Sequence, residues 1–307
     1  MKQRKFLDYL ILSLKGMAMG AADAVPGVSG GTIALISGIY QELVNTIGNI
    51  NISLFKVFKN QGVKSFWIKL NGNFLLALIT GIFISFILFM RIAKYLLEHH
   101  PILIWSFFFG LIIASIIFVA KQIKKWDITL VIALIVGATT AFYVSTLPSL
   151  SNNNSPYFLF FAGAIAICAM ILPGISGAFI LVILGAYKTL SNAIDNFDVQ
   201  KLIFFFLGAF VGLLSFSKLL KWLFKKYETI TLAVLTGFIV GSLNKIWPWK
   251  KIISTRLNSE GIETPLLTQS VSPFSYEGDP QLTTAIVLAI TGFLTIISLE
   301  KIGSRKK

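Results

Sequence analysis

The chain has 307 residues, of which 55% are hydrophobic and 13% are charged, and its formal net charge is +14. Soluble domains carry about twice this share of charged residues, so lipid must solvate much of the surface. Lysine and arginine stand at the ends of apolar runs rather than along one polar face, which argues against nucleic-acid binding. The single Cys168 excludes an intramolecular disulfide, and two adjacent histidines are too few for a metal site, so we expect neither a metal nor a cofactor.

The first apolar region, residues 9–49, is interrupted by Pro-Gly-Val-Ser-Gly-Gly at 26–31. Proline lacks an N–H and stops the incoming helix, and glycine permits a sharp reversal of the chain. The alanines and glycines just before the break allow two helical arms to pack closely. The pattern predicts a broken-helix hairpin, which can be re-entrant or can cross the membrane fully.

A basic insert at residues 50–72 separates this hairpin from three long apolar runs. Each run is long enough to cross about 30 Å of hydrocarbon as a helix. The predicted spans, all within residues 73–147, cover 73–97, 101–122 and 126–147.

The second half repeats this order. Its first apolar region, 157–195, is broken by Pro-Gly-Ile-Ser-Gly at 173–177, and a polar segment at 250–279 precedes the last apolar run. The predicted spans, all within residues 200–300, cover 200–224, 229–249 and 280–300. The Trp-Pro-Trp sequence at 247–249 is typical of an interfacial aromatic belt.

The distribution of basic residues predicts the topology. If each broken region returns to its starting side, the N-terminus, the insert 50–72 and the basic C-terminal tail all lie on one side of the membrane. The positive-inside rule makes that side cytoplasmic and places 250–279 outside. We therefore expect a multi-pass protein with both termini cytoplasmic, whose basic helix ends contact anionic lipids.

An internal repeat relates the two halves. Residues 26–47 align with 173–194 without a gap, and eleven of the 22 aligned positions are identical. The chain thus divides into repeat 1, residues 1–150, and repeat 2, residues 151–307, within one membrane domain. Three spans after each hairpin make an odd number, so the second repeat enters the membrane inverted. This predicts an all-α fold of two inverted-topology repeats, as in secondary transporters, although a duplication that serves only as scaffold is the alternative.

Each Pro-Gly-x-Ser-Gly motif predicts a helix start that can bind phosphate through backbone N–H groups. The serine hydroxyls can cap these helices. A packing kink between closely approaching helices is the alternative. The predicted phosphate-binding residues are Ser29, Gly30, Gly31, Thr32, Ser176, Gly177 and Ala178, and the turn residues are Pro26, Gly27, Pro173 and Gly174.

Four charged residues in or near the apolar regions are further candidates. Acids at membrane depth are costly, so Asp23 and Glu42 are candidates for proton coupling. Equally, Asp23 can have a turn-capping role and Glu42 a solvated position. Arg91 and Lys218 occupy equivalent places in the two repeats and can pair with a phosphate, or can snorkel to the interface.

The sequence Ala-Asp-Ala-Val-Pro-Gly-Val-Ser-Gly-Gly-Thr at 22–32, followed by Gly-x-Tyr-x-Glu at 38–42, resembles the bacterial polyprenyl-phosphate translocases, formerly a domain of unknown function. The second copy, at 172–178, is similar, and the resemblance covers nearly the whole chain. It implies a protein of the bacterial cytoplasmic membrane that returns undecaprenyl phosphate, the carrier lipid of cell-wall synthesis, from the outer to the inner leaflet. Ala178 and Phe179 replace Gly31 and Thr32, so a strictly symmetric phosphate site is not expected.

Rival functions remain open. The chain has no HExxH, GxSxG or Walker motif, so we expect no enzyme. A membrane phosphatase acting on undecaprenyl pyrophosphate would need an arginine after each motif serine, where Gly30 and Gly177 stand. The composition and the spans also suit a transporter of a small soluble anion or a purely structural membrane protein.

Overall fold

The computed structural model describes residues 4–24, 28–147, 150, 155–257 and 263–304. In the N-terminal half, two long helices pack side by side and two short helices follow the first of them. The helices of this half are α1 (Phe6–Asp23), α2 (Gly30–Ile36), α3 (Tyr40–Gly48), α4 (Ile52–Lys69), α5 (Gly72–His99), α6 (Pro101–Ala120) and α7 (Ile128–Thr146).

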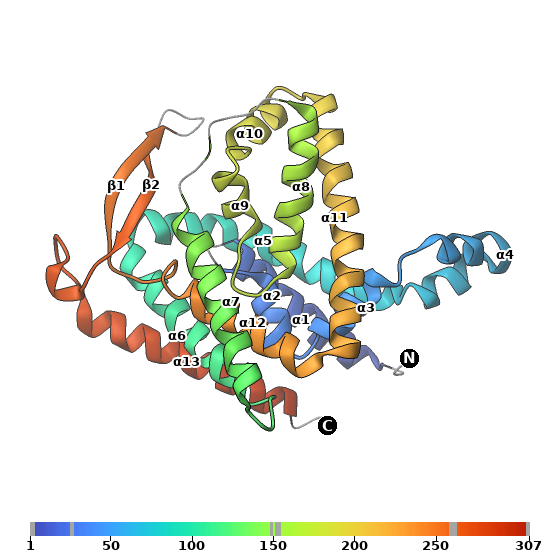
Figure 1. Cartoon of the computed structure of the whole chain (residues 1–307), viewed down its shortest axis with the longest axis horizontal. Coiled ribbons are helices and arrows are strands. Elements are labelled where there is room, and N and C mark those ends of the chain that lie inside the picture. Colours follow the sequence, from blue (N-terminus) through green and yellow to red (C-terminus); the bar gives the residue numbers. More distant parts are fainter. Residues whose placement is uncertain (1–3, 25–27, 148–149, 151–154, 258–262, 305–307) are drawn as a thin grey trace.

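The C-terminal half has the same order of long and short helices, with a β-hairpin before its last helix (Figure 1). Its elements are α8 (Pro156–Ile171), α9 (Gly177–Ile183), α10 (Tyr187–Asp195), α11 (Val199–Lys226), α12 (Glu228–Ser242), β1 (Lys250–Leu257), β2 (Glu263–Ser270), a 3₁₀ turn η1 (Pro273–Ser275) and α13 (Leu282–Ser304).

Four of the six predicted membrane spans are confirmed as apolar helices of sufficient length. Among the described residues, α5, α6, α7 and α11 are each long and apolar enough to cross a membrane. The helices α8, α12 and α13 are apolar but have shorter apolar stretches. The chain is therefore a multi-pass membrane protein, and the orientation of its termini stays a prediction.

Both broken regions fold back at their motifs. The short helix α2 packs against α1, and α9 packs against α8. Two residues after the end of each short helix stands a glycine with positive φ, Gly38 at 73° and Gly185 at 67°, a conformation that glycine adopts without a steric penalty. Beyond Gly185 the chain turns by 105° into α10. Each region is thus one long helix followed by two short ones.

Long helices pair within each half and across the two halves. Within them, α1 packs along α5, and α8 along α11. Across them, α6 packs along α13 and α7 along α12. Glycines allow these close crossings, since the position of a Cβ on Gly292 would collide with the Phe107 carbonyl, and one on Gly237 with the Leu134 carbonyl. The second span of each half thus packs on the third span of the other.

The segment 250–279, predicted only as a polar stretch between spans, contains regular structure in an otherwise helical fold. It contains the antiparallel hairpin β1–β2, which suits the β-branched residues of Lys-Lys-Ile-Ile-Ser-Thr at 250–255. The helix before it stops at Ser242, well short of the predicted span end at 249. The reason is that Trp247 and Trp249 pack against the segment between β2 and α13, where their indole N–H groups donate to the carbonyls of Val271 (2.8 Å) and Pro280 (2.9 Å).

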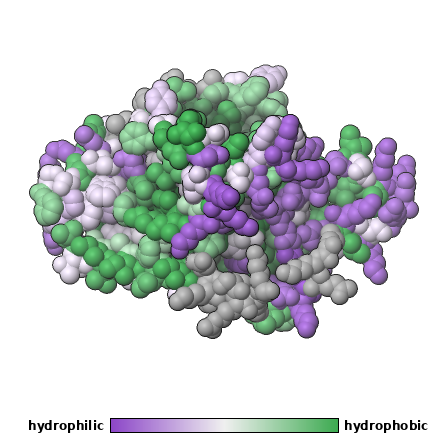
Figure 2. Space-filling view, turned by 60° about the horizontal axis from the view of Figure 1, so that its bottom comes forward, coloured by the Kyte–Doolittle hydropathy of each residue, from purple (hydrophilic) through white to green (hydrophobic). Residues whose placement is uncertain are grey.

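The insert and the hairpin lie at opposite ends of the molecule. Figure 1 shows α4 projecting from one end and β1–β2 covering the other. Figure 2 shows hydrophilic side chains gathered toward the end that carries α4, whereas hydrophobic side chains cover much of the other part of that face. The polarity of this face therefore changes along its length.

Candidate functional site

The two Pro-Gly-x-Ser-Gly turns, far apart in the sequence, touch each other. Ser29 Oγ donates to the Leu172 carbonyl at 3.1 Å. In return, the Gly174 N–H donates to Thr32 Oγ1 at 3.0 Å. A side chain on Gly31 would meet the carbonyl oxygen of Ile171 at 2.5 Å, so only glycine permits this approach. The structure thus brings the two predicted halves of the site together.

The donors of the first turn already have partners. The Gly30 N–H donates to Asp23 Oδ1 at 2.7 Å, and the Gly31 N–H donates to Ser29 Oγ at 3.1 Å. Ser29, Gly30, Gly31 and Thr32 are all buried. A carboxylate of the chain itself therefore lies where the sequence predicts a phosphate. Pro26 and Gly27 lie outside the described residues.

The second turn is more open. Gly174 has φ +82° and packs against Phe238 and Ile239 of α12, and Pro173 beside it is buried. Ser176 is half-buried and makes no side-chain cap hydrogen bond to α9. Gly177 is buried, whereas Ala178, the next residue, is exposed. The sequence difference between the motifs thus corresponds to a difference in access.

The other predicted charged residues do not all reach the turns. Glu42 accepts two hydrogen bonds from the Arg4 guanidinium, at 2.7 and 2.5 Å, near the N-terminus. Lys218 is exposed on α11, where the preceding carbonyl lies against Gly48 of α3. Arg91 belongs to α5, and its side chain lies outside what the structure describes.

Sequence reasoning missed two lysines beside the second turn. Lys245 Nζ lies 4.0 Å from the centre of the Phe179 ring, which belongs to α9. Lys250 Nζ lies 4.7 Å from the centre of the Trp105 ring on α6. The only sequence signal is that both flank the Trp-Pro-Trp segment, which on its own indicates an interfacial belt.

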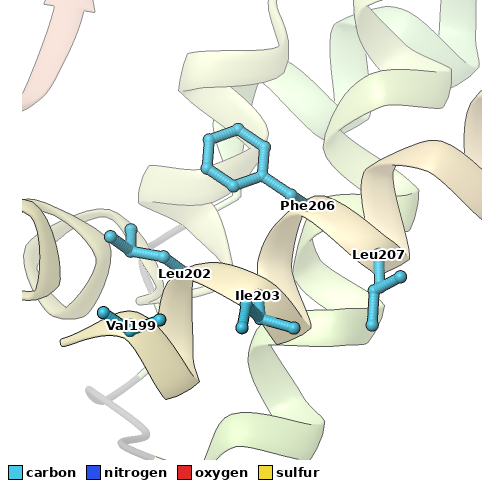
Figure 3. Close-up of a pocket in the computed structure, with 5 residues that line it drawn as sticks. All are labelled: Val199, Leu202, Ile203, Phe206 and Leu207. Carbon is cyan, nitrogen blue, oxygen red and sulfur yellow. The ribbon is translucent and has the colours of Figure 1, made fainter.

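An apolar depression lies on the outer face of α11. Figure 3 shows its lining side chains, Val199, Leu202, Ile203, Phe206 and Leu207, all from the first turns of this helix. It offers no polar group to a phosphate, so it can contact only hydrocarbon.

These features define a class: a multi-pass membrane protein in which two broken helices, one from each half of the chain, meet at a buried point. The chain belongs to the undecaprenyl phosphate translocase-like family, whose profile matches residues 19–264, as the resemblance at the two motifs predicted.

Two curated relatives cover nearly the whole chain. It is 45% identical to a polyprenyl-phosphate transporter of Vibrio cholerae over 305 residues, which is 98% of this chain and 99% of the relative. It is 33% identical to a polyprenyl-phosphate transporter of Staphylococcus aureus over 327 aligned positions, which cover all of both chains. No solved structure matches the chain.

Proposed function

We propose that this protein transports polyprenyl phosphate across the bacterial cytoplasmic membrane. In this proposal it returns undecaprenyl phosphate from the outer to the inner leaflet for reuse in cell-wall synthesis. Its family and the names of its two relatives support the substrate. The observation that carries the proposal is the direct contact between the two broken helices, since transporters bind substrate where such helices meet.

The proposed phosphate site comprises both turns. Its residues are Ser29, Gly30, Gly31, Thr32, Ser176, Gly177 and Ala178, with Arg91 and Lys218 as cations that meet the phosphate on its way in or out. The openness of the second turn, at Ser176 and Ala178, supports entry of the phosphate there before the first turn. At the first turn the phosphate has to displace the Asp23 carboxylate from the Gly30 N–H.

This competition suggests how protons couple to transport. A protonated Asp23 is a weaker acceptor for the Gly30 N–H and does not repel the phosphate, so proton uptake favours entry of the substrate at the first turn. Glu42, the second candidate, is neutralised by Arg4, and its protonation would release that arginine.

The proposed architecture is a pair of inverted repeats with both termini cytoplasmic. Support comes from the matching helix order of the two halves and from the reciprocal packing of α6 on α13 and of α7 on α12. The isoprenoid tail stays in lipid against apolar helix faces such as the depression on α11. Basic helix ends contact anionic lipids.

The test is transport of fluorescent undecaprenyl phosphate in proteoliposomes, read as loss of accessibility to a quencher outside. We expect protein-dependent transfer between leaflets and no release of phosphate from undecaprenyl pyrophosphate. Release of phosphate would establish the phosphatase alternative, and transfer no faster than in empty vesicles would refute lipid transport.

One pair of variants tests the site itself. A side chain on Gly30 would collide with Asp23, and one on Gly177 with the Ala166 carbonyl. Substitutions at these glycines would therefore disturb helix packing as well as phosphate binding, and their effects on binding could not be separated. Ala178 is exposed, and Ala178→Asp places a negative charge at the second turn. We expect Ala178→Asp to reduce transport at least about tenfold, and Ala178→Asn, of the same size, to retain it. Equal activity of the two variants would contradict the site.

A further inference from the structure

Two basic side chains enclosed at one place have no acidic partner among the described residues. Lys245 follows the end of α12, and Lys250 begins β1. Both are mostly shielded from water, and neither forms an ion pair with a described carboxylate. The nearby Lys251 differs, because it is exposed and paired with Glu277 at 2.5 Å.

The contacts of the two ammonium groups leave several donors unused. Lys250 Nζ donates to the Lys245 carbonyl, which places its ammonium beside the end of α12. Lys245 Nζ faces the ring of Phe179, and Lys250 Nζ faces the ring of Trp105. Aromatic rings attract a cation but accept little hydrogen bonding. Each ammonium carries three N–H donors, so most of these donors face no strong acceptor of the described chain.

Two like charges in a shielded place are costly unless an anion joins them. Burial, with a smaller contribution from the neighbouring Lys245 ammonium, lowers the pKa of Lys250 to about 7. The other groups that face the pair, Phe179 on α9 and Trp105 on α6, do not titrate and offer no compensating charge.

We propose that Lys245 and Lys250 form an anion site for a phosphate monoester, at which the headgroup of polyprenyl phosphate docks before it reaches the two turns. The lipid identity of the ligand rests on the proposed function, whereas the phosphate chemistry rests on the two lysines. Phe179 places the site directly beside the open second turn, since it lies in the same short helix as Ala178. The site also lies next to the β-hairpin, at the opposite end of the molecule from α4 (Figure 1).

The first experiment measures binding to purified protein in phosphatidylcholine nanodiscs that contain undecaprenyl phosphate. We expect Lys245→Met and Lys250→Met each to weaken binding at least about tenfold, because a charge-assisted hydrogen bond is lost. Lys251→Met is the matched control and should bind like the wild type. Unchanged binding by Lys245→Met and Lys250→Met would overturn the proposal.

A second measurement needs no variant and therefore does not depend on folding of the methionine variants. Amine-reactive labelling of the wild-type protein, read lysine by lysine by mass spectrometry, is compared in nanodiscs with and without undecaprenyl phosphate. We expect the lipid to protect Lys245 and Lys250 from labelling and to leave Lys251 reactive. Equal protection by phosphatidylglycerol would reduce the site to a general contact with anionic lipid and overturn the proposal.

Repeating the labelling with inorganic phosphate instead of the lipid tests the anion site independently of the proposed lipid transport. Protection by inorganic phosphate, without protection by undecaprenyl phosphate, would keep the anion site and refute lipid docking there. Transport of undecaprenyl phosphate by a wild-type protein whose Lys245 and Lys250 stay fully reactive would keep the function and overturn the site.

Discussion

Asp23 is the residue at which capping and transport compete. Its carboxylate accepts a hydrogen bond from the Gly30 N–H at 2.7 Å, and the phosphate is proposed to accept from the same N–H group. A cap of this kind stabilises the start of α2 when the site is empty. The hydrogen bond seen in the structure thus agrees with the turn-capping role, which was one of the two roles that the sequence allowed for Asp23. The other role, proton coupling, stays a prediction.

Replacing Asp23 by asparagine separates these roles. The amide oxygen of Asp23→Asn can still accept the Gly30 N–H, so we expect the melting temperature to stay close to that of the wild type, whereas Asp23→Ala costs about 1 kcal/mol of stability. If Asp23 carries a proton, transport by Asp23→Asn loses its dependence on pH. Proteoliposome transport between pH 6 and 9 measures this. A wild-type pH profile in Asp23→Asn would reduce the residue to a cap.

A second prediction at the residue scale concerns Lys250 and the dependence of the free energy of unfolding on pH. Its pKa is about 7 in the folded protein, compared with 10.5 for an ordinary lysine. Between these values the unfolded chain binds more protons than the folded chain, so the free energy of unfolding increases as the pH rises through this window, and this contribution is constant below it. The slope is at most about 1.4 kcal/mol per pH unit.

Chemical unfolding from pH 7 to pH 9 in detergent tests this effect. Wild-type protein should gain stability relative to Lys250→Met over this range, with Lys251→Met following the wild type. Parallel curves for wild type and Lys250→Met would show that the Lys250 ammonium is not shielded as the structure indicates.

Among the elements, α4 stands out because many of its apolar side chains are exposed, although Leu54 and Val57 near its start are buried. Ile52, Phe55 and Val63 are each at least 65% exposed. The helix also contains four lysines and no acid, and it kinks at Gly62, where φ is +77°. Apolar and basic side chains together on an exposed helix are typical of an element that lies in a membrane interface.

We expect α4 to lie on anionic lipid. An environment-sensitive fluorophore at Val63→Cys, in a Cys168→Ser background, should emit at shorter wavelength in nanodiscs with phosphatidylglycerol than in phosphatidylcholine alone. Replacing the four lysines by glutamine should remove this difference, since each lysine contributes about 1 kcal/mol near an anionic surface. A response that survives the glutamine substitutions would contradict the electrostatic part of the argument.

The helices also show which features of the fold the sequence predicts and which it does not. Hydropathy locates α5, α6, α7 and α11, because the thickness of the hydrocarbon core sets a minimum length for the apolar stretch of any spanning helix. It places the end of α12 too late, because the tryptophans at 247 and 249 satisfy an interfacial pattern while packing against the segment between β2 and α13. The partner of the Gly30 N–H depends on how the chain closes at the turn, which no periodicity encodes.

At the scale of the whole molecule, the positions of two polar elements bear on the topology prediction. The insert α4 and the β-hairpin lie at opposite ends of the molecule (Figure 1), as expected if they face opposite sides of the membrane. Cysteines introduced by Lys59→Cys and Glu277→Cys in a Cys168→Ser background should therefore differ in reactivity with an impermeant maleimide. In intact cells Glu277→Cys should react at once, and Lys59→Cys only after permeabilisation. Labelling of both from outside would refute the topology.

The exchange of partners between the second and third spans has an evolutionary consequence. The helix α6 finds its main neighbour in α13, and α12 finds its main neighbour in α7. A chain of half this length would therefore leave the glycine-lined faces of both spans uncovered. It could cover them only by pairing with a second copy of itself. If the two halves arose by duplication, as the repeat at 26–47 and 173–194 predicts, the ancestor of this protein would thus have been a homodimer, and the fused chain would preserve the interface of that dimer as its own core.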